Sequence, residues 1–206
     1  MAISKIFSNA SSITKGTTGS LVSTKTQAGK RVAQRRGPVR YIFSVSNNSM
    51  RYSDYLTLET EVSSLGYGED LVVTSLPVDI SRARGSWEGT PVVNGASQTG
   101  TSISISGFTP NTSGVIKEGD FIQFYNHEKV YQSTEDRASD SSGEVVVELN
   151  TDVIQSPINN SSIIYGSSVE FHLSIEEMPE YNFIPMNGNE SLVETSGDWK
   201  LEEVIL

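Results

Sequence analysis

The fold of this chain is decided by KEGDFIQF at residues 117–124. Gly119 and Asp120 are turn-forming residues, and the aromatic and β-branched residues after them fit a buried strand. A second turn of the same kind lies at Gly143, before the apolar run EVVVEL at residues 144–149. Gly119, Asp120 and Gly143 are therefore predicted as structural turns of a small β-barrel.

Short strands are predicted on both sides of this stretch. The apolar runs are brief, rich in β-branched or aromatic residues, and bounded by Gly, Pro, Asn or Ser. A helical period is not evident, and Gly85 ends a possible short turn over residues 80–84. Strands are predicted over residues 40–45, 55–62, 70–76, 101–105, 121–125, 129–133, 144–149, 168–173, 181–184 and 199–205.

These elements predict an all-β chain with little helix. Residues 39–90 and 174–206 are expected to form a β-sandwich-like domain, with residues 91–173 as an inserted small β-barrel module. Residues 1–38, rich in Ser, Thr, Gly, Lys and Arg, are expected to form an extended basic arm. The 206-residue chain has no cysteine, so it needs and forms no disulfide, and it fits assembly in a reducing cytoplasm.

Charge is divided sharply along the chain, whose net charge is −10. Nine basic residues and no acidic ones precede Asp54, whereas six basic residues face 25 acidic ones from Asp54 onward. The basic residues that could bind a neighbouring subunit are Lys30, Arg31, Arg35, Arg36 and Arg40.

Three interpretations of this basic arm remain open. It could neutralise nucleic-acid phosphates, lie across the acidic body of a neighbouring subunit, or remain a solvated tail. The acidic remainder would repel DNA, so sequence-specific nucleic-acid binding is not expected. Contact with a neighbouring subunit is the preferred interpretation, and deletion of residues 1–38 is then expected to lower ring yield and leave the monomer folded.

The two histidines do not predict a catalytic or metal site. His127 lies in a polar link between two predicted strands and is interpreted as a solvated hairpin residue, because a catalytic histidine needs an orienting partner. His172 alternates with Phe171 and Leu173 and is interpreted as a residue on the polar face of a strand. Without cysteine, two isolated histidines do not form a transition-metal site.

The acidic clusters also favour solvated edges over chemistry. Arg137 and Ala138 interrupt the acidic loop, so it lacks the alternating carboxylates of a calcium site. A glycosidase pair would need aromatic neighbours in a cleft, and a phosphate loop would need a lysine, which residues 95–100 lack. The clusters considered are Asp136, Asp140 and Glu144 for calcium and Glu176, Glu177 and Glu180 for glycosidase chemistry. No catalytic, cofactor or metal residue is assigned, and no run of about 18 apolar residues predicts a membrane span.

Residues 91–173 resemble a module that recurs in tail proteins of tailed bacteriophages. The resemblance is carried by PVVNGASQTG at 91–100, SISISG at 102–107, VIKEGDFIQF at 115–124, KVY at 129–131, SGEVVV at 142–147 and SPI at 156–158. The endings MPEYNF at 178–183 and EEVI at 202–205 are similar to that family as well. The chain departs from the family in its short link from Pro77 to Gly89 and in the basic arm before Arg40.

The resemblance implies a distal-tail or baseplate-hub structural protein without enzymatic activity. Such a protein forms a homo-oligomeric ring, expected to be hexameric, and docks tube, hub or fibre proteins. It would be located in the virion tail after assembly in the host cytoplasm.

Two other functions remain as alternatives. A carbohydrate-binding β-module could stack sugars on Trp87, Tyr165 or Trp199, although each is more simply a core or strand-edge aromatic. A head–tail or DNA-associated adaptor would bind duplex with a strong dependence on salt.

Overall fold

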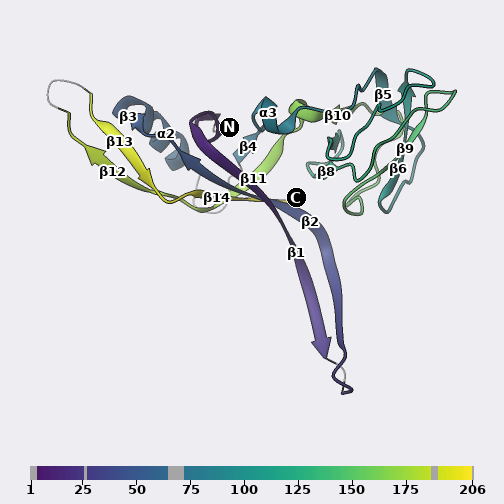
Figure 1. The fold of residues 1–206 in the computed structure, drawn as a ribbon, viewed down its shortest axis with the longest axis horizontal. Coiled ribbons are helices and arrows are strands. Elements are labelled where there is room, and N and C mark those ends of the chain that lie inside the picture. Colours follow the sequence, from purple (N-terminus) through teal and green to yellow (C-terminus); the bar gives the residue numbers. More distant parts are fainter. Residues whose placement is uncertain (1–3, 26, 65–71, 187–189, 206) are drawn as a thin grey trace.

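The computed structural model describes residues 4–25, 27–64, 72–186 and 190–205. The chain is mostly β-structured, which confirms the predicted all-β class. Its largest element is an antiparallel five-stranded sheet, termed the body sheet, in which strands from the two ends of the chain are neighbours (Figure 1). The strands run in the order β1 (Ala10–Lys25), β2 (Arg31–Asn47), β14 (Trp199–Glu203), β11 (Phe171–Glu177) and β4 (Val72–Thr74).

Helices help to cover the apolar face of the body sheet, where a sandwich would have placed a second sheet. Ile6 and Phe7 of α1 (Ser4–Ser8) and Leu58 of α2 (Tyr52–Ser64) are buried in the same core as the aromatic residues of β2 and β11. Each helix buries only the apolar side chains on its inward face, so a few residues of α1 and α2 are enough to cover this part of the sheet.

Helix α2 shows that the strand predicted over residues 55–62 was wrong. Leu58 is buried and Tyr55, three residues earlier, is half-buried, which is a helical spacing. The β-branched Thr57 and Thr60 had favoured a strand. Each of their hydroxyls instead donates to the carbonyl oxygen four residues earlier, so both threonines fit a helix.

A second, smaller sheet extends the body on the side of α2 (Figure 1). Its order is β12 (Glu180–Ile184), β13 (Leu192–Ser196) and β3 (Met50–Arg51). Tyr55 of α2 packs on Tyr181 of β12, with ring centroids 4.8 Å apart. The predicted strand over residues 181–184 lies within β12, whereas β13 was not predicted.

The central part of the chain folds into a small closed barrel, termed the barrel module. Its two three-stranded sheets are β10 (Ile163–Tyr165), β7 (Phe121–Phe124) and β8 (Val130–Gln132), and β5 (Gly89–Val93), β6 (Ser102–Phe108) and β9 (Val145–Glu148). Isolated bridges pair Val92 with Ser162 and Ser133 with Leu149. These bridges join the two sheets at both edges, so the pairing closes on itself.

Two short helical elements flank the barrel module, α3 (Val78–Ser81) before it and η1 (Gly166–Ser168) after it. The module has its own apolar core, which already includes Trp87, whereas Phe171 and Leu173 belong to the core of the body. Of the strand predicted over residues 70–76, residues 70 and 71 lie outside the described part of the chain, β4 supplies residues 72–74, and residues 75 and 76 are not in a strand.

Candidate interaction surfaces

The β1–β2 hairpin projects from the body as a long arm, termed the hairpin arm (Figure 1). Its strands pair from Ala10 opposite Asn47 to Lys25 opposite Arg31. Within the described chain, β14 pairs with β2 at residues 42–45 and no further toward the tip. The outer part of each strand is therefore hydrogen-bonded along one edge to the other strand and presents its second edge outward.

The hairpin arm corrects the expectation that residues 1–38 can be removed from a folded monomer. This segment contains the buried Ile6 and Phe7 and all of β1, whose first part pairs with the body portion of β2. The Ser- and Thr-rich sequence shows no clear side-chain period, but backbone pairing does not require one. A deletion that tests the arm must therefore be confined to its outer part.

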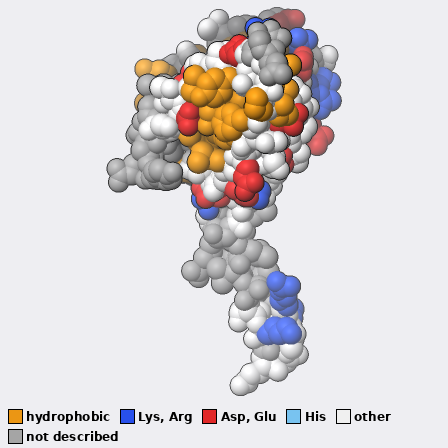
Figure 2. All heavy atoms as spheres, turned by 90° about the vertical axis from the view of Figure 1, so that its left-hand side faces the viewer, with side chains coloured by type: hydrophobic (Ala, Val, Ile, Leu, Met, Phe, Trp, Pro, Cys, Tyr) orange, Lys and Arg blue, Asp and Glu red, His pale blue; other side chains and the backbone are white. Residues whose placement is uncertain are grey.

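The hairpin arm carries only basic charge. Residues 10–47 contain seven lysines and arginines and no acidic residue. Lys25, Lys30 and Arg31 are exposed near the tip, where Figure 2 shows basic side chains. The side chains of Arg35 and Arg36 lie outside the described part of the structure.

Arg40 does not belong to the outer arm. Its guanidinium lies 2.9 Å from a carboxylate oxygen of Glu202 on the neighbouring strand β14 of the same chain. Arg40 is therefore engaged at the base of the hairpin, within the body of its own chain.

Asp120 is a buried anchor of the barrel module. Asp120 is only 1% exposed. The carboxylate accepts hydrogen bonds from the backbone N–H groups of Arg84 (2.6 Å), Gly85 (3.0 Å) and Lys117 (3.0 Å), and from the indole N–H of Trp87 (2.9 Å). One side chain thus joins the segment that enters the module to the turn before β7.

Gly119 and Gly143 occupy backbone conformations that favour glycine. Their φ angles are +93° and +75°. A Cβ on Gly143 would also lie 2.2 Å from the carbonyl oxygen of Phe108, which is far inside van der Waals contact. A side chain at residue 143 would therefore displace the end of β6.

A buried ion pair, termed the junction pair, joins the barrel module to the body. Lys129 Nζ lies 2.7 Å from Glu203 Oε2, and the two side chains are 0% and 1% exposed. Glu203 also accepts the backbone N–H groups of Tyr41 and Val130, each at 3.1 Å. Lys129 Nζ donates to the carbonyl oxygen of Val130 and lies 4.6 Å from the Tyr41 ring centroid.

The junction pair was not predicted from the sequence. Lys129 and Glu203 are 74 residues apart, and each stands in a charged stretch typical of a surface. Burial lowers the pKa of Lys129, and the carboxylate of Glu203 opposes that shift. The backbone N–H groups that Glu203 accepts and the carbonyl oxygen to which Lys129 donates offset part of the desolvation cost of the pair.

The interpretation of His127 as a solvated residue was wrong. The residue is only 9% exposed, and its Nε2 lies 2.9 Å from the hydroxyl of Tyr131. That hydroxyl accepts the backbone N–H of Ile154 and can donate its own proton to Nε2 of a neutral imidazole. His127 lies close to β8 inside the module, so the polar link between β7 and β8 turns this side chain toward the interior.

Stability should fall with acid through His127. Burial, and secondly the charge of Lys129, lower its pKa from 6.5 to about 4. Between these values the unfolded chain binds the proton more readily, so the contribution of His127 to stability is present above about pH 6.5 and lost toward pH 4. The variant His127→Gln should flatten this part of the stability profile, by up to about 3 kcal/mol in urea unfolding between pH 7 and pH 4. An unchanged pH profile would contradict this role.

The other candidate residues occupy structural positions. His172 lies half-buried on β11, as predicted, with Nδ1 3.2 Å from Glu128 Oε2. Asp140 accepts the backbone N–H groups of Ser142 and Glu144, and thus closes a turn. In the described residues, no group of three or more His, Cys, Asp or Glu side chains is placed to hold a metal ion.

The remaining acidic candidates and the tryptophans have local partners. Asp136 forms an ion pair with Lys117 and Glu177 with Lys200. Trp87 and Trp199 are 3% and 1% exposed, and Trp87 stacks on Tyr165 with ring centroids 4.3 Å apart. The tryptophans are therefore core residues and offer no face to a sugar.

Exposed aromatic residues gather at the end of the body formed by α2 and β12. This aromatic patch consists of Tyr52, Tyr55, Leu56, Tyr181 and Phe183. Phe183 is 46% exposed, Leu56 42% and Tyr52 40%. Figure 2 shows the apolar surface at this end of the molecule, bordered by acidic side chains. A contiguous apolar surface of this kind marks an interaction site.

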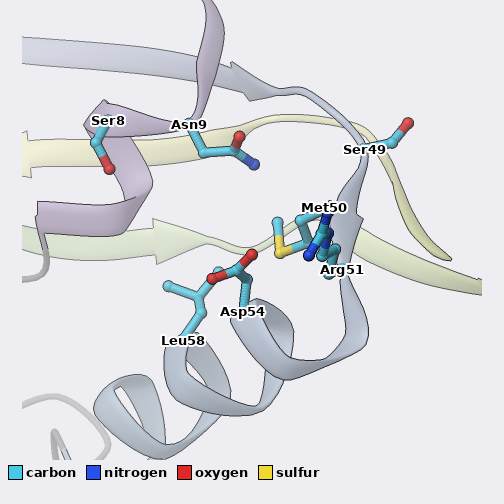
Figure 3. Close-up of a pocket in the computed structure, with 7 residues that line it drawn as sticks. All are labelled: Ser8, Asn9, Ser49, Met50, Arg51, Asp54 and Leu58. Atoms are coloured by element: carbon cyan, nitrogen blue, oxygen red, sulfur yellow. The ribbon is translucent and has the colours of Figure 1, made fainter. Parts of the chain in front are cut away.

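A shallow hollow of about 310 Å³ lies between α1, β3 and α2 (Figure 3). Met50 and Leu58 supply its apolar part, and Arg51 and Asp54 its charged part. The other lining residues are Ser8, Asn9 and Ser49. These groups provide polar and apolar contacts but not the paired acid and base of a catalytic site.

The described chain has a β-sheet body joined to a closed barrel by a buried ion pair, and its projecting basic hairpin and apolar patch are surfaces suited to contacts with other proteins. No helix in the described chain is long and apolar enough to cross a bilayer.

Comparison with known families finds a match to a phage distal tail protein domain in the middle of the chain. Residues 79–167 match the family model described as distal tail protein pb9, B domain. This match confirms the resemblance seen in the sequence, and it covers the barrel module from α3 to η1. No curated protein matches the chain. The match to this domain supports a structural, non-enzymatic role in a phage tail.

Proposed function

We propose that the chain assembles into a closed ring of identical copies, hexameric as the family resemblance implies, at the distal end of the phage tail. The ring would dock tube, hub or fibre proteins, and it would be assembled in the host cytoplasm. The observation that carries this proposal is the hairpin arm, which leaves the body with only basic charge on a chain of net charge −10.

The arm has the properties of an element that binds a neighbouring copy. Its outer strands have a hydrogen-bonding edge that is not paired within the described chain. Its cations are attracted to the acidic body of another copy, and each exposed pair contributes about 0.2–1 kcal/mol. Such contacts direct the orientation of association more than they add affinity.

The two hydrophobic cores suggest different roles for the two parts of the chain. We propose that the segments before Trp87 and from Phe171 onward form the ring-building body, and that the barrel module between them, expected from the sequence over residues 91–173, presents a docking surface to other tail proteins. An acidic inner surface of the ring would let DNA pass without sticking. The turns at Gly119, Asp120 and Gly143 hold the barrel module in shape for that task.

The alternatives are less well supported. The carbohydrate-binding module was predicted to stack sugars on Trp87, Tyr165 or Trp199, and the two tryptophans are buried and Trp87 already stacks on Tyr165. A DNA-associated adaptor is favoured only by the cations of the arm. Such an adaptor would bind duplex DNA with an affinity that falls steeply as the salt concentration rises.

Shortening the hairpin arm tests the ring. Residues 21–35 would be replaced by Asn-Gly, a two-residue turn between Ser20 and Arg36, which are register partners. We expect a folded monomer with an unchanged thermal midpoint, and loss of the ring in native mass spectrometry, because the tip contacts are gone.

The matched control is Lys200→Ala, which removes an exposed cation outside the arm and should keep the ring. A shortened chain that still forms full rings would eliminate the arm from assembly, and an unmodified chain that stays monomeric would eliminate the ring.

A further inference from the structure

We propose that the aromatic patch receives the tip of the hairpin arm from a second copy of this chain. The inference rests on the proposed function, because it names the surface that the arm occupies. It assigns the exposed end of α2 and β12 as one side of the contact between neighbouring copies.

The aromatic patch is built as a preformed receiving surface. Tyr55 packs against Phe183 (5.1 Å between ring centroids) and Tyr181 (4.8 Å), and Tyr52 against Phe183 (6.0 Å). The rings hold one another in place while Tyr52 and Phe183 remain about half exposed. A rigid group of aromatic side chains loses little conformational freedom on binding, which is typical of interface centres.

The chemistry of the patch selects cations. Helix α2 carries three acidic residues, Asp54, Glu59 and Glu61, and no basic one. Glu59 contributes, after burial, to raising the pKa of Tyr55, so its charge acts at the rings themselves. Glu190 accepts the backbone N–H of Ser53 at the start of the helix and lies within the influence of Arg51, the cation that precedes the helix.

The hairpin tip offers the complementary groups. Lys25 lies opposite Arg31 across the tip, and Lys30 is next to it. Gln27, Ala28 and Gly29 between these cations are exposed and small or polar, which allows the tip to approach a surface closely. The chain already places lysines over aromatic rings, since Lys15 Nζ lies 4.7 Å from the Phe121 centroid and Lys129 Nζ 4.6 Å from the Tyr41 centroid.

Geometry requires that the contact join two copies. The patch lies at the end of the body formed by α2 and β12, whereas the arm extends away from the middle of the body (Figure 1). The outer arm spans roughly 25 Å at about 3.3 Å per residue. It therefore cannot fold back to its own patch but can reach a neighbour. Because tip and patch are different surfaces, the contact can repeat head-to-tail from copy to copy, and it closes a ring where the rotation between neighbouring copies closes.

Cysteine cross-linking tests the pairing directly, since the chain contains no cysteine. Chains with Ala28→Cys at the tip would be mixed with chains with Leu56→Cys in the patch and treated with a short bismaleimide. We expect a covalent dimer on a denaturing gel. The matched control pairs Ala28→Cys with Val146→Cys, an exposed position on the barrel module, and should give at least tenfold less dimer. Equal cross-linking in both mixtures would overturn the inference.

Substitution of the patch separates this inference from the ring itself. The variant Tyr52→Ser/Phe183→Ser should weaken self-association at least tenfold, whereas Tyr125→Ser, which removes a 77% exposed tyrosine from the barrel module, should not. Glu59→Lys should weaken association in the same way, and Lys25→Glu/Arg31→Glu in the same chain should restore part of it.

The outcomes are distinguishable. If shortening the arm abolishes the ring while all patch variants retain it, the arm has another receiving surface, and this inference fails although the proposed function survives. If the patch variants bind each other normally but lose another tail protein, the patch belongs to that partner and the inference is again overturned.

Discussion

Replacing Glu203 with glutamine (Glu203→Gln) should lower the free energy of unfolding by about 3–5 kcal/mol. The substitution leaves the ammonium of Lys129 in a site where it is 0% exposed, without its counter-charge. Removing one partner of a buried ion pair is costly because the other charge remains desolvated. The junction pair also ties β8 to β2 and β14, so the contact between barrel module and body should loosen.

Urea unfolding of the full chain measures this effect, with Glu202→Gln as the matched control. Glu202 precedes Glu203 on the same strand but pairs with Arg40 at the surface, so its loss should cost about 0–1 kcal/mol. The double variant Lys129→Met/Glu203→Gln removes both charges and should recover part of the stability. Equal effects of Glu202→Gln and Glu203→Gln would show that burial of the pair does not govern its strength.

Replacing Asp120 with alanine (Asp120→Ala) should cost about 3–5 kcal/mol and destabilise the barrel module selectively. Three backbone N–H groups and the indole N–H of Trp87 would lose their acceptor in a buried site. Each hydrogen bond to a charged group contributes about 1.5–3 kcal/mol, although losses at one site are not additive.

The effect of Asp120→Ala is measured by urea unfolding and by hydrogen exchange of the N–H groups that Asp120 accepts in the unmodified chain. The matched control is Asp140→Ala, which removes an exposed carboxylate that accepts backbone N–H groups in a turn. Water can replace Asp140 as an acceptor, so the cost should stay near 1 kcal/mol or below. A comparable loss from both variants would contradict the importance of the buried site.

The barrel module was the part of the fold that the sequence predicted best. Its strands β6, β7, β8 and β9 lie where apolar runs and turn residues placed them. Local chemistry is decisive there, because Gly119 and Gly143 occupy positive φ and Asp120 accepts hydrogen bonds from nearby turns. The strands β5 and β10 were missed, since GTPVV begins with glycine and contains proline, and IIY is short.

The body was less predictable because its signals are long-range. The Ser- and Thr-rich start of the chain shows no side-chain alternation, yet it forms β1 by backbone pairing with β2. The residues of α2 have β-branched content typical of a strand, but packing of Tyr55 and Leu58 selects the helix. Tertiary packing overrides a weak local preference in both cases.

The candidate surfaces divide in the same way. The sequence shows that the first part of the chain is basic and the rest acidic, and it locates the cations of the arm. It does not show that these cations lie on a projecting β-hairpin, or that Tyr52 and Phe183 meet on one surface. That arrangement depends on α2 and β12, which lie more than a hundred residues apart in the chain.

By itself, the sequence determined the all-β class, the barrel with its turns, the resemblance to phage distal tail proteins and the separation of charge. Only the tertiary structure decided the hairpin, the junction pair, the buried state of His127 and the aromatic patch. The physical reason is that turns and strand patterns are set by neighbouring residues. Burial of a charge or exposure of a ring depends on which distant segments pack against it.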